Sequence, residues 1–227
     1  MRLLWVFFLV WPSLGAAEVY RFIVEENPPY VDPYSSGKGV FVEKISDVLV
    51  MNDKELELYF DLWQNIPPRL HPEKAITLTY QKDVQLMEKW AFSKPLFILK
   101  TGLLTEESTT IHWKHLHDLR GFRIGVTSSV TYGEKFEAFR THLKIIEAPS
   151  DLQNIEAITG KKIDFMVVEK YMLDELLEFI PTTKKNSLRW IGKPLIHEMP
   201  VYAICSRNYV GCRQRLTVLE EGLTKDK

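Results

Sequence analysis

The stretch LRGFRIGVTSS, residues 119–129, contains the pattern that decides the fold. Residues 122–126 are mainly apolar and are typical of a strand, and Ser128 and Ser129 are residues that favour the first position of a helix. Phe136 and Phe139 follow at helical spacing. The same order of strand, loop and amphipathic helix occurs near the beginning of the chain, at residues 19–24 and 42–49. The chain therefore contains two units that begin with the same order of elements.

The alternation of short strands and helices continues along both halves. Further strands are predicted at residues 56–62, 75–80, 95–104, 144–147, 163–168 and 201–205, and further helices at residues 152–158, 172–179 and 214–222. Such alternation predicts an α/β protein whose mainly parallel sheets are flanked by helices. We expect lobe one to comprise residues 18–102 and 198–227, lobe two to comprise residues 103–197, and two hinge strands to join them.

Length and charge restrict the classes of function. The 227 residues carry 29 Lys and Arg against 30 Asp and Glu, a formal net charge of −1. A balanced charge of this kind predicts no binding of nucleic acid or of an anionic membrane surface. The chain is long enough for two small lobes with buried cores, and we expect it to be a monomer.

Residues 1–17 have the layout of a secretory signal peptide. Arg2 precedes an apolar run, residues 3–11, and small residues follow at Gly15, Ala16 and Ala17. The apolar run is too short to span a bilayer. Because no Cys stands at the expected cleavage point, we expect a periplasmic protein that begins near Glu18, with neither a lipid anchor nor an inserted segment.

Cys205 and Cys212 are the two cysteines of the chain. In an oxidising compartment this pair could close a small loop through a disulfide. The alternative is that Cys205 is a core residue of its apolar run and Cys212 an exposed neighbour. Two such residues are too few to hold a structural metal.

Five segments carry a resemblance to a known family. In chain order they are VEENPPY (24–30), GVFVE (39–43), FSKPL (92–96), LRGFRIGV (119–126) and GKKID (160–164). Together they resemble motifs of the bacterial extracellular solute-binding proteins of family 3, the receptors of polar amino-acid ABC importers. The resemblance covers nearly the entire chain after residue 17. It implies the two-lobed periplasmic binding protein fold of type II.

The resemblance also implies a function. It predicts a receptor that closes on a small polar ligand and passes it to an ABC permease, without cofactor, metal or catalysis. The alternative is a sensing or interaction module that signals through a separate membrane partner. An enzyme on the same fold is a third reading. The sequence has no G-x-S-x-G, no H-E-x-x-H and no phosphate loop, and His112, His115 and His117 are interpreted as a solvated surface.

One departure from the family concerns the ligand. Family members that bind α-amino acids place an Arg six residues before the Phe of Phe-Ser-x-Pro, where it grips the ligand carboxylate with two hydrogen bonds. Leu86 stands at that position here. Lys82 is a substitute in sequence terms, although an ammonium lacks the planar fork of Arg. The expected ligand is therefore polar and amine-bearing, and its resemblance to an amino acid is left open.

Five polar residues are predicted to bind the ligand. Glu25 and Glu26 follow the first strand, where the carboxyl edge of the sheet faces the crevice, and one of them is expected to point inward. Ser129 and Thr131 take the place of the family's anion-binding helix start, and capping of the helix is the alternative role. Glu169 stands where the family has an acidic residue that pairs with the ligand amine; an internal lysine partner is the alternative.

Three aromatic residues complete the predicted site. Tyr30, Trp63 and Tyr80 are candidates for its walls, since flat rings bury ligand area at little entropic cost. Packing in the core is the alternative for each ring.

Overall fold

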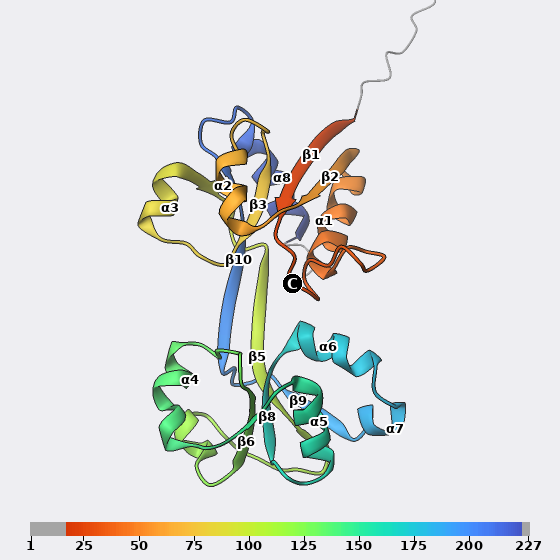
Figure 1. Cartoon of the computed structure of the whole chain (residues 1–227), viewed down its shortest axis with the longest axis vertical. Helices are drawn as coiled ribbons and strands as arrows, with labels where there is room; N and C mark the ends of the chain where they lie inside the picture. Colours follow the sequence, from red (N-terminus) through yellow and green to blue (C-terminus); the bar gives the residue numbers. More distant parts are fainter. Residues whose placement is uncertain (1–16, 224–227) are drawn as a thin grey trace, which may run out of the picture.

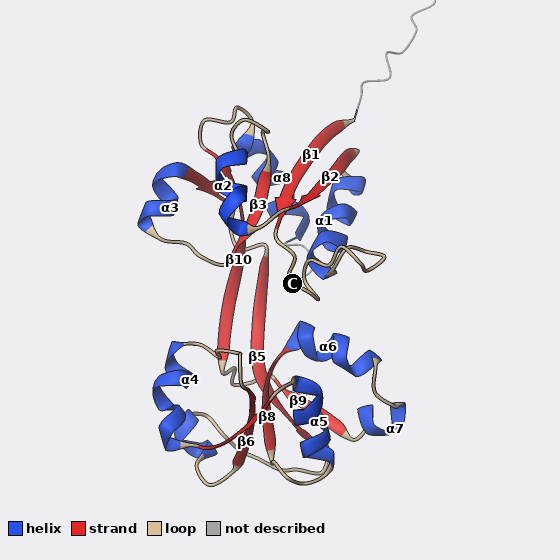
Figure 2. Ribbon diagram, viewed as in Figure 1, coloured by secondary structure: helices blue, strands red, loops and turns tan. Residues whose placement is uncertain are grey.

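The computed structural model describes residues 17–223, which form two lobes connected by two long strands (Figure 1). The predicted signal peptide, residues 1–17, lies outside the described part except for Ala17. Helices cover both faces of the sheet in each lobe (Figure 2). The fold class predicted from the sequence is confirmed. None of the helices within residues 17–223 is long and apolar enough to cross a membrane.

Lobe one is built on three parallel strands in the order β2-β1-β3. Its main core cluster lies between this sheet and the helices α1 and α8, and contains alternate β1 residues such as Tyr20, Phe22 and Val24. Ile23 points to the opposite face, into a smaller cluster beneath α2. The elements of lobe one are β1 (Glu18–Val24), α1 (Val40–Met51), β2 (Lys54–Phe60), η1 (Trp63–Asn65), α2 (Ile66–Arg69), β3 (Ile76–Thr79), α3 (Val84–Lys89), β4 (Trp90–Phe92) and α8 (Cys212–Leu223).

Lobe two repeats this plan around the strands β8-β6-β7, which are also parallel. Successive β8 residues enter different clusters, Phe165 and Val167 on one face and Met166 and Val168 on the other. The sheet is therefore buried on both sides. The elements of lobe two are η2 (Leu116–Leu119), β6 (Arg123–Thr127), α4 (Glu134–Phe139), η3 (Arg140–His142), β7 (Lys144–Ala148), α5 (Asp151–Thr159), β8 (Phe165–Glu169), α6 (Lys170–Glu178), α7 (Thr182–Lys185) and β9 (Leu188–Ile191).

The strands β5 (Phe97–Glu106) and β10 (His197–Ser206) run from one lobe into the other. They pair with each other in antiparallel register from Phe97 opposite Val201 to Thr101 opposite His197. Beyond this segment, β5 pairs with β8 and β9 in lobe two, and β10 pairs with β3 and β4 in lobe one. These are the two hinge strands that the sequence predicted.

One expected helix start is wrong. Ser128 and Ser129 do not open a helix, because α4 begins at Glu134 after Gly133, whose φ of 90° is readily adopted only by glycine. The buried Tyr132 explains the delay: its hydroxyl oxygen accepts a hydrogen bond of 2.7 Å from the Thr127 amide, which folds residues 128–132 into a loop. The short elements α3, β4 and β9 were not predicted.

A disulfide joins Cys205 at the end of β10 to Cys212 at the start of α8, with a Cα–Cα distance of 5.9 Å. Both residues are buried, so the bond attaches the last helix to the core of lobe one.

Replacing both cysteines with alanine should lower the free energy of unfolding by about 2 to 3 kcal/mol, since the closed loop restricts the unfolded chain. Urea unfolding of the parent and the double variant measures this loss. Alkylation of both thiols in unfolded, unreduced protein would contradict the bond.

Candidate ligand-binding site

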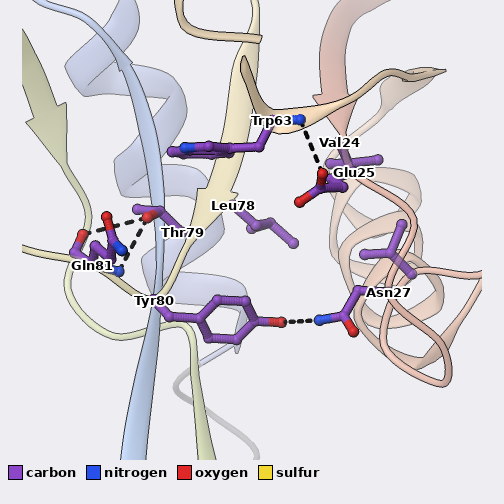
Figure 3. Close-up of a pocket in the computed structure, with 9 residues that line it drawn as sticks. Val24, Glu25, Asn27, Trp63, Leu78, Thr79, Tyr80 and Gln81 are labelled. Carbon is purple, nitrogen blue, oxygen red and sulfur yellow. Dashed lines mark hydrogen bonds between the residues drawn. The ribbon is translucent and has the colours of Figure 1, made fainter. Parts of the chain in front are cut away.

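A cavity of about 300 Å³ opens in lobe one at the carboxyl ends of β1 and β3 (Figure 3). Ligands of open α/β sheets bind at this edge, and in Figure 1 the edge points toward lobe two. The residues that line the cavity come from the ends of β1 and β3, from the loops that follow these two strands, and from η1. They are Val24, Glu25, Asn27, Val31, Trp63, Leu78, Thr79, Tyr80 and Gln81.

The polar groups of this cavity are fixed by hydrogen bonds. Glu25 Oε1 accepts from the backbone amide of Trp63 at 3.0 Å, which holds the carboxylate beside the Trp63 backbone (Figure 3). Across the cavity, Asn27 Nδ2 donates to the Tyr80 hydroxyl at 2.9 Å (Figure 3). Burial is the main cause that raises the pKa of Tyr80, so its hydroxyl stays neutral. The site therefore presents one carboxylate, the Trp63 indole and a Tyr80 ring whose hydroxyl is held by a hydrogen bond.

The structure brings three of the eight predicted residues into this cavity: Glu25, Trp63 and Tyr80. Glu26 is exposed and does not line it. Tyr30 is 8% exposed and belongs to the core of lobe one, where its ring lies 5.0 Å from that of Phe41. Asn27 lines the cavity and was not predicted, although it directly follows the two glutamates.

Tyr30 and Glu169 link the two lobes. The Tyr30 hydroxyl donates to Glu169 Oε2 at 2.8 Å. The same carboxylate accepts from the backbone amides of Lys100 at 3.3 Å and Met172 at 3.1 Å. Glu169 is thus the N-cap of α6 and is bound on three sides. Its partners are a hydroxyl and two amides rather than a lysine side chain.

Aromatic packing strengthens the contact between the lobes. Tyr171 at the start of α6 meets Tyr30 edge to face at 6.4 Å, and meets Phe41 in the same way at 6.0 Å. Burial is the largest cause that raises the pKa of Tyr30, and the negative charges of Glu169 and Asp151 raise it further. Tyr30 therefore remains a hydrogen-bond donor at neutral pH. Neither Tyr171 nor Asp151 was predicted from the sequence.

The facing edge of lobe two is a polar loop. Ser129 and Thr131 are exposed on the loop between β6 and α4, so neither caps a helix. At the base of this loop Thr127 donates to the carboxylate of Asp151 and accepts from Asn154 Nδ2 at 3.2 Å. Burial raises the pKa of Asp151, while the hydrogen bond from Thr127 opposes the rise. Asp151 is the first residue of α5, directly after the capping residue Ser150 and close to the end of β7, and this position is the signal that would have identified it.

The two residues considered for a carboxylate clamp lie outside the cavity. Leu86 is half-buried on α3, a helix capped by Asp83. The Lys82 ammonium lies 4.8 Å from the ring centre of Tyr202 and 5.6 Å from that of Phe92, which places it over aromatic faces. Within residues 17–223 no group of His, Cys, Asp and Glu residues could hold a metal ion.

Comparisons with known proteins establish the fold. The L-cystine solute receptor of Neisseria gonorrhoeae, in its unliganded open conformation, is similar with a TM-score of 0.70 and 14% identity, over 92% of this chain and 87% of that one. The second substrate-binding domain of a putative amino-acid ABC transporter from Streptococcus pneumoniae gives a TM-score of 0.65 at 16% identity, over 91% and 92% of the two chains.

A sensor domain shares the same architecture. A histidine kinase sensor domain with similarity to periplasmic binding proteins gives a TM-score of 0.51 at 13% identity, over 92% of this chain and 90% of that one. No family model and no curated protein matches the sequence. The architecture is therefore that of the two-lobed periplasmic binding proteins, and the comparisons define the fold alone.

The contact between Tyr30 and Glu169 yields a test of how the lobes are held. Tyr30→Phe keeps the ring contacts but removes the donor to Glu169. We expect the lobes to separate more widely, which raises the radius of gyration in small-angle X-ray scattering, and the free energy of unfolding to fall by about 1 kcal/mol. Tyr80→Phe, which loses a hydroxyl bonded within lobe one, is the matched control. Equal radii for the parent and both variants would show that the bond does not restrain the lobes.

Proposed function

We propose that this chain is a solute-binding receptor whose two lobes close on a small polar ligand. The observation that carries the proposal is the lined cavity at the carboxyl edge of the lobe-one sheet, opposite the exposed loop of Ser129 and Thr131. Only the closed form brings both edges to the ligand, so that form has the higher affinity and binding shifts the protein toward it. The protein binds its ligand and leaves it chemically unchanged.

The division into lobes follows the hinge. We assign residues 18–102 and 198–227 to lobe one and residues 103–197 to lobe two, because β5 exchanges its partner β10 for β8 near Thr101. The ligand is held by Glu25, Trp63 and Tyr80 of lobe one, and by Ser129 and Thr131 after closure. Glu169 acts on the relative position of the lobes through Tyr30 rather than on the ligand.

The compartment and partner belong to the same proposal. The signal-like residues 1–17 and the disulfide between Cys205 and Cys212 agree with a periplasmic receptor. An amine-bearing ligand captured there is handed to an ABC permease. The likeness to a kinase sensor domain supports a second candidate, in which the closed form is read by a membrane sensor. The two roles are separated by identifying the membrane protein that co-purifies with the chain in the presence of ligand. A permease supports transport, and a sensor supports signalling.

A thermal-shift screen tests the receptor role. We expect at least one compound among amino acids, polyamines, organic acids and sugars to stabilise the purified protein, by about 2.7 kcal/mol at a hundredfold excess over its Kd. Trp63→Ala should abolish the shift because it removes a wall of the cavity. Phe179→Ala, at a residue 75% exposed at the end of α6, is the control and should keep it. A shift that survives Trp63→Ala, or no shift with any compound, would contradict the proposal.

A further inference from the structure

We propose that the ligand of the lobe-one cavity is a flat organic cation without a carboxylate group. This inference rests on the proposed receptor function and names the chemical class of its ligand. It departs from the amino-acid specificity that the sequence resemblance implies. Three properties of the described residues carry it. They are the charge of the cavity, its aromatic walls, and the position of the nearby Lys82 over aromatic rings outside the cavity.

The cavity carries a negative charge. Among the nine residues that line it, all in the described part of the chain, Glu25 is the one with a formal charge. The amide of Trp63 bonds to Oε1, and within residues 17–223 no donor is bonded to Oε2. A carboxylate held at the wall of a concave site favours a ligand of opposite charge. Glu25 is therefore available to pair with a cationic group.

Two aromatic rings offer further stabilisation to a cation. Trp63 and Tyr80 line the cavity from different segments, η1 and the loop that follows β3 (Figure 3). The bond from Asn27 fixes the Tyr80 hydroxyl, so this ring needs no reordering when a ligand arrives. Ring faces attract cations, and a flat cation also buries its area against them. A guanidinium or an imidazolium suits this cavity because its charge can pair with the Glu25 carboxylate and its flat face can lie against an aromatic ring.

None of the nine described residues that line the cavity offers a cationic side chain to a ligand carboxylate. Leu86 stands where amino-acid receptors of the resembling family carry their clamp, and Lys82 lies over Phe92 and Tyr202. Two acids of lobe two, Asp151 and Glu169, lie near enough for their charges to act on Tyr30 at the boundary of the lobes. An anionic group would therefore be repelled on both sides of the closing cleft.

Matched pairs of ligands test this directly by calorimetry on the whole purified chain. Agmatine and arginine share a guanidinium, and histamine and histidine share an imidazole; in each pair the amino acid alone carries a carboxylate. We expect the amine of at least one pair to bind at least about tenfold more tightly than its amino acid, a difference of about 1.4 kcal/mol. Equal or tighter binding of both amino acids would overturn the inference.

Two neighbouring glutamates supply matched variants. Glu25→Gln keeps an oxygen for the Trp63 amide but removes the charge, and it should weaken binding of the amine about tenfold. Glu26→Gln makes the same change at the exposed neighbour that does not line the cavity, and it should leave the affinity unchanged. Equal effects of the two substitutions would show that charge near the cleft acts only from a distance, contrary to a direct pairing with Glu25.

The two proposals fail in different ways. If no compound of the screen binds, the receptor function itself is wrong. If a dicarboxylate, a neutral sugar or an amino acid binds while the four paired compounds show no preference for the amines, and Trp63→Ala abolishes that binding, the receptor function stands and the cationic ligand is refuted.

Discussion

Two paired strands carry the chain between the lobes, and the rest of the molecule depends on this crossing. From Phe97 to Thr101 in β5 and from His197 to Val201 in β10, each strand is hydrogen-bonded mainly to the other. On either side, each strand joins the sheet of one lobe, where side chains pack on both faces. Because packed sheets do not deform continuously, bending concentrates in the crossing. The lobes are therefore expected to move as two bodies.

The contacts next to the crossing connect this motion to the candidate site. Glu169 lies opposite Thr101 in the β5–β8 pairing, so its carboxylate stands at the point where the hinge enters lobe two. It accepts a hydrogen bond from Tyr30. Tyr30 follows Glu25 and Asn27 in a tight turn, which is closed by a hydrogen bond of 2.8 Å from the Asn27 amide to the Val31 carbonyl oxygen. One short loop thus carries both a contact between the lobes and three residues of the cavity wall, Glu25, Asn27 and Val31. A ligand that moves this loop also acts on the hinge.

Much of this arrangement could be predicted because it is local in the sequence. Strand and helix periodicity indicated the α/β class, and the resemblance of five local segments indicated the two-lobed fold. Glu25 was identified because it follows a strand whose carboxyl end faces the crevice, and Trp63 and Tyr80 because aromatic rings suit the walls of a site. The link between Tyr30 and Glu169 joins residues 139 positions apart, and no local pattern reveals it. The same holds for Lys82, whose aromatic partner Tyr202 is in a distant strand. The helix expected at Ser128 failed because the buried Tyr132 takes the Thr127 amide, a competition that propensity does not describe.

The central claim is that ligand binding in lobe one brings the lobes together, and an interlobe distance tests it most directly. Gln85 and Lys135 are exposed residues of α3 and α4. These two helices lie on the same side of the molecule, one in each lobe (Figure 1). Spin labels at these two positions report their separation in solution, with and without the compound that gives the largest thermal shift. The account predicts a broad distribution that becomes shorter and narrower when the compound is added, and that does not change in the Trp63→Ala variant. A distribution unaltered at saturating ligand in the parent protein would contradict it.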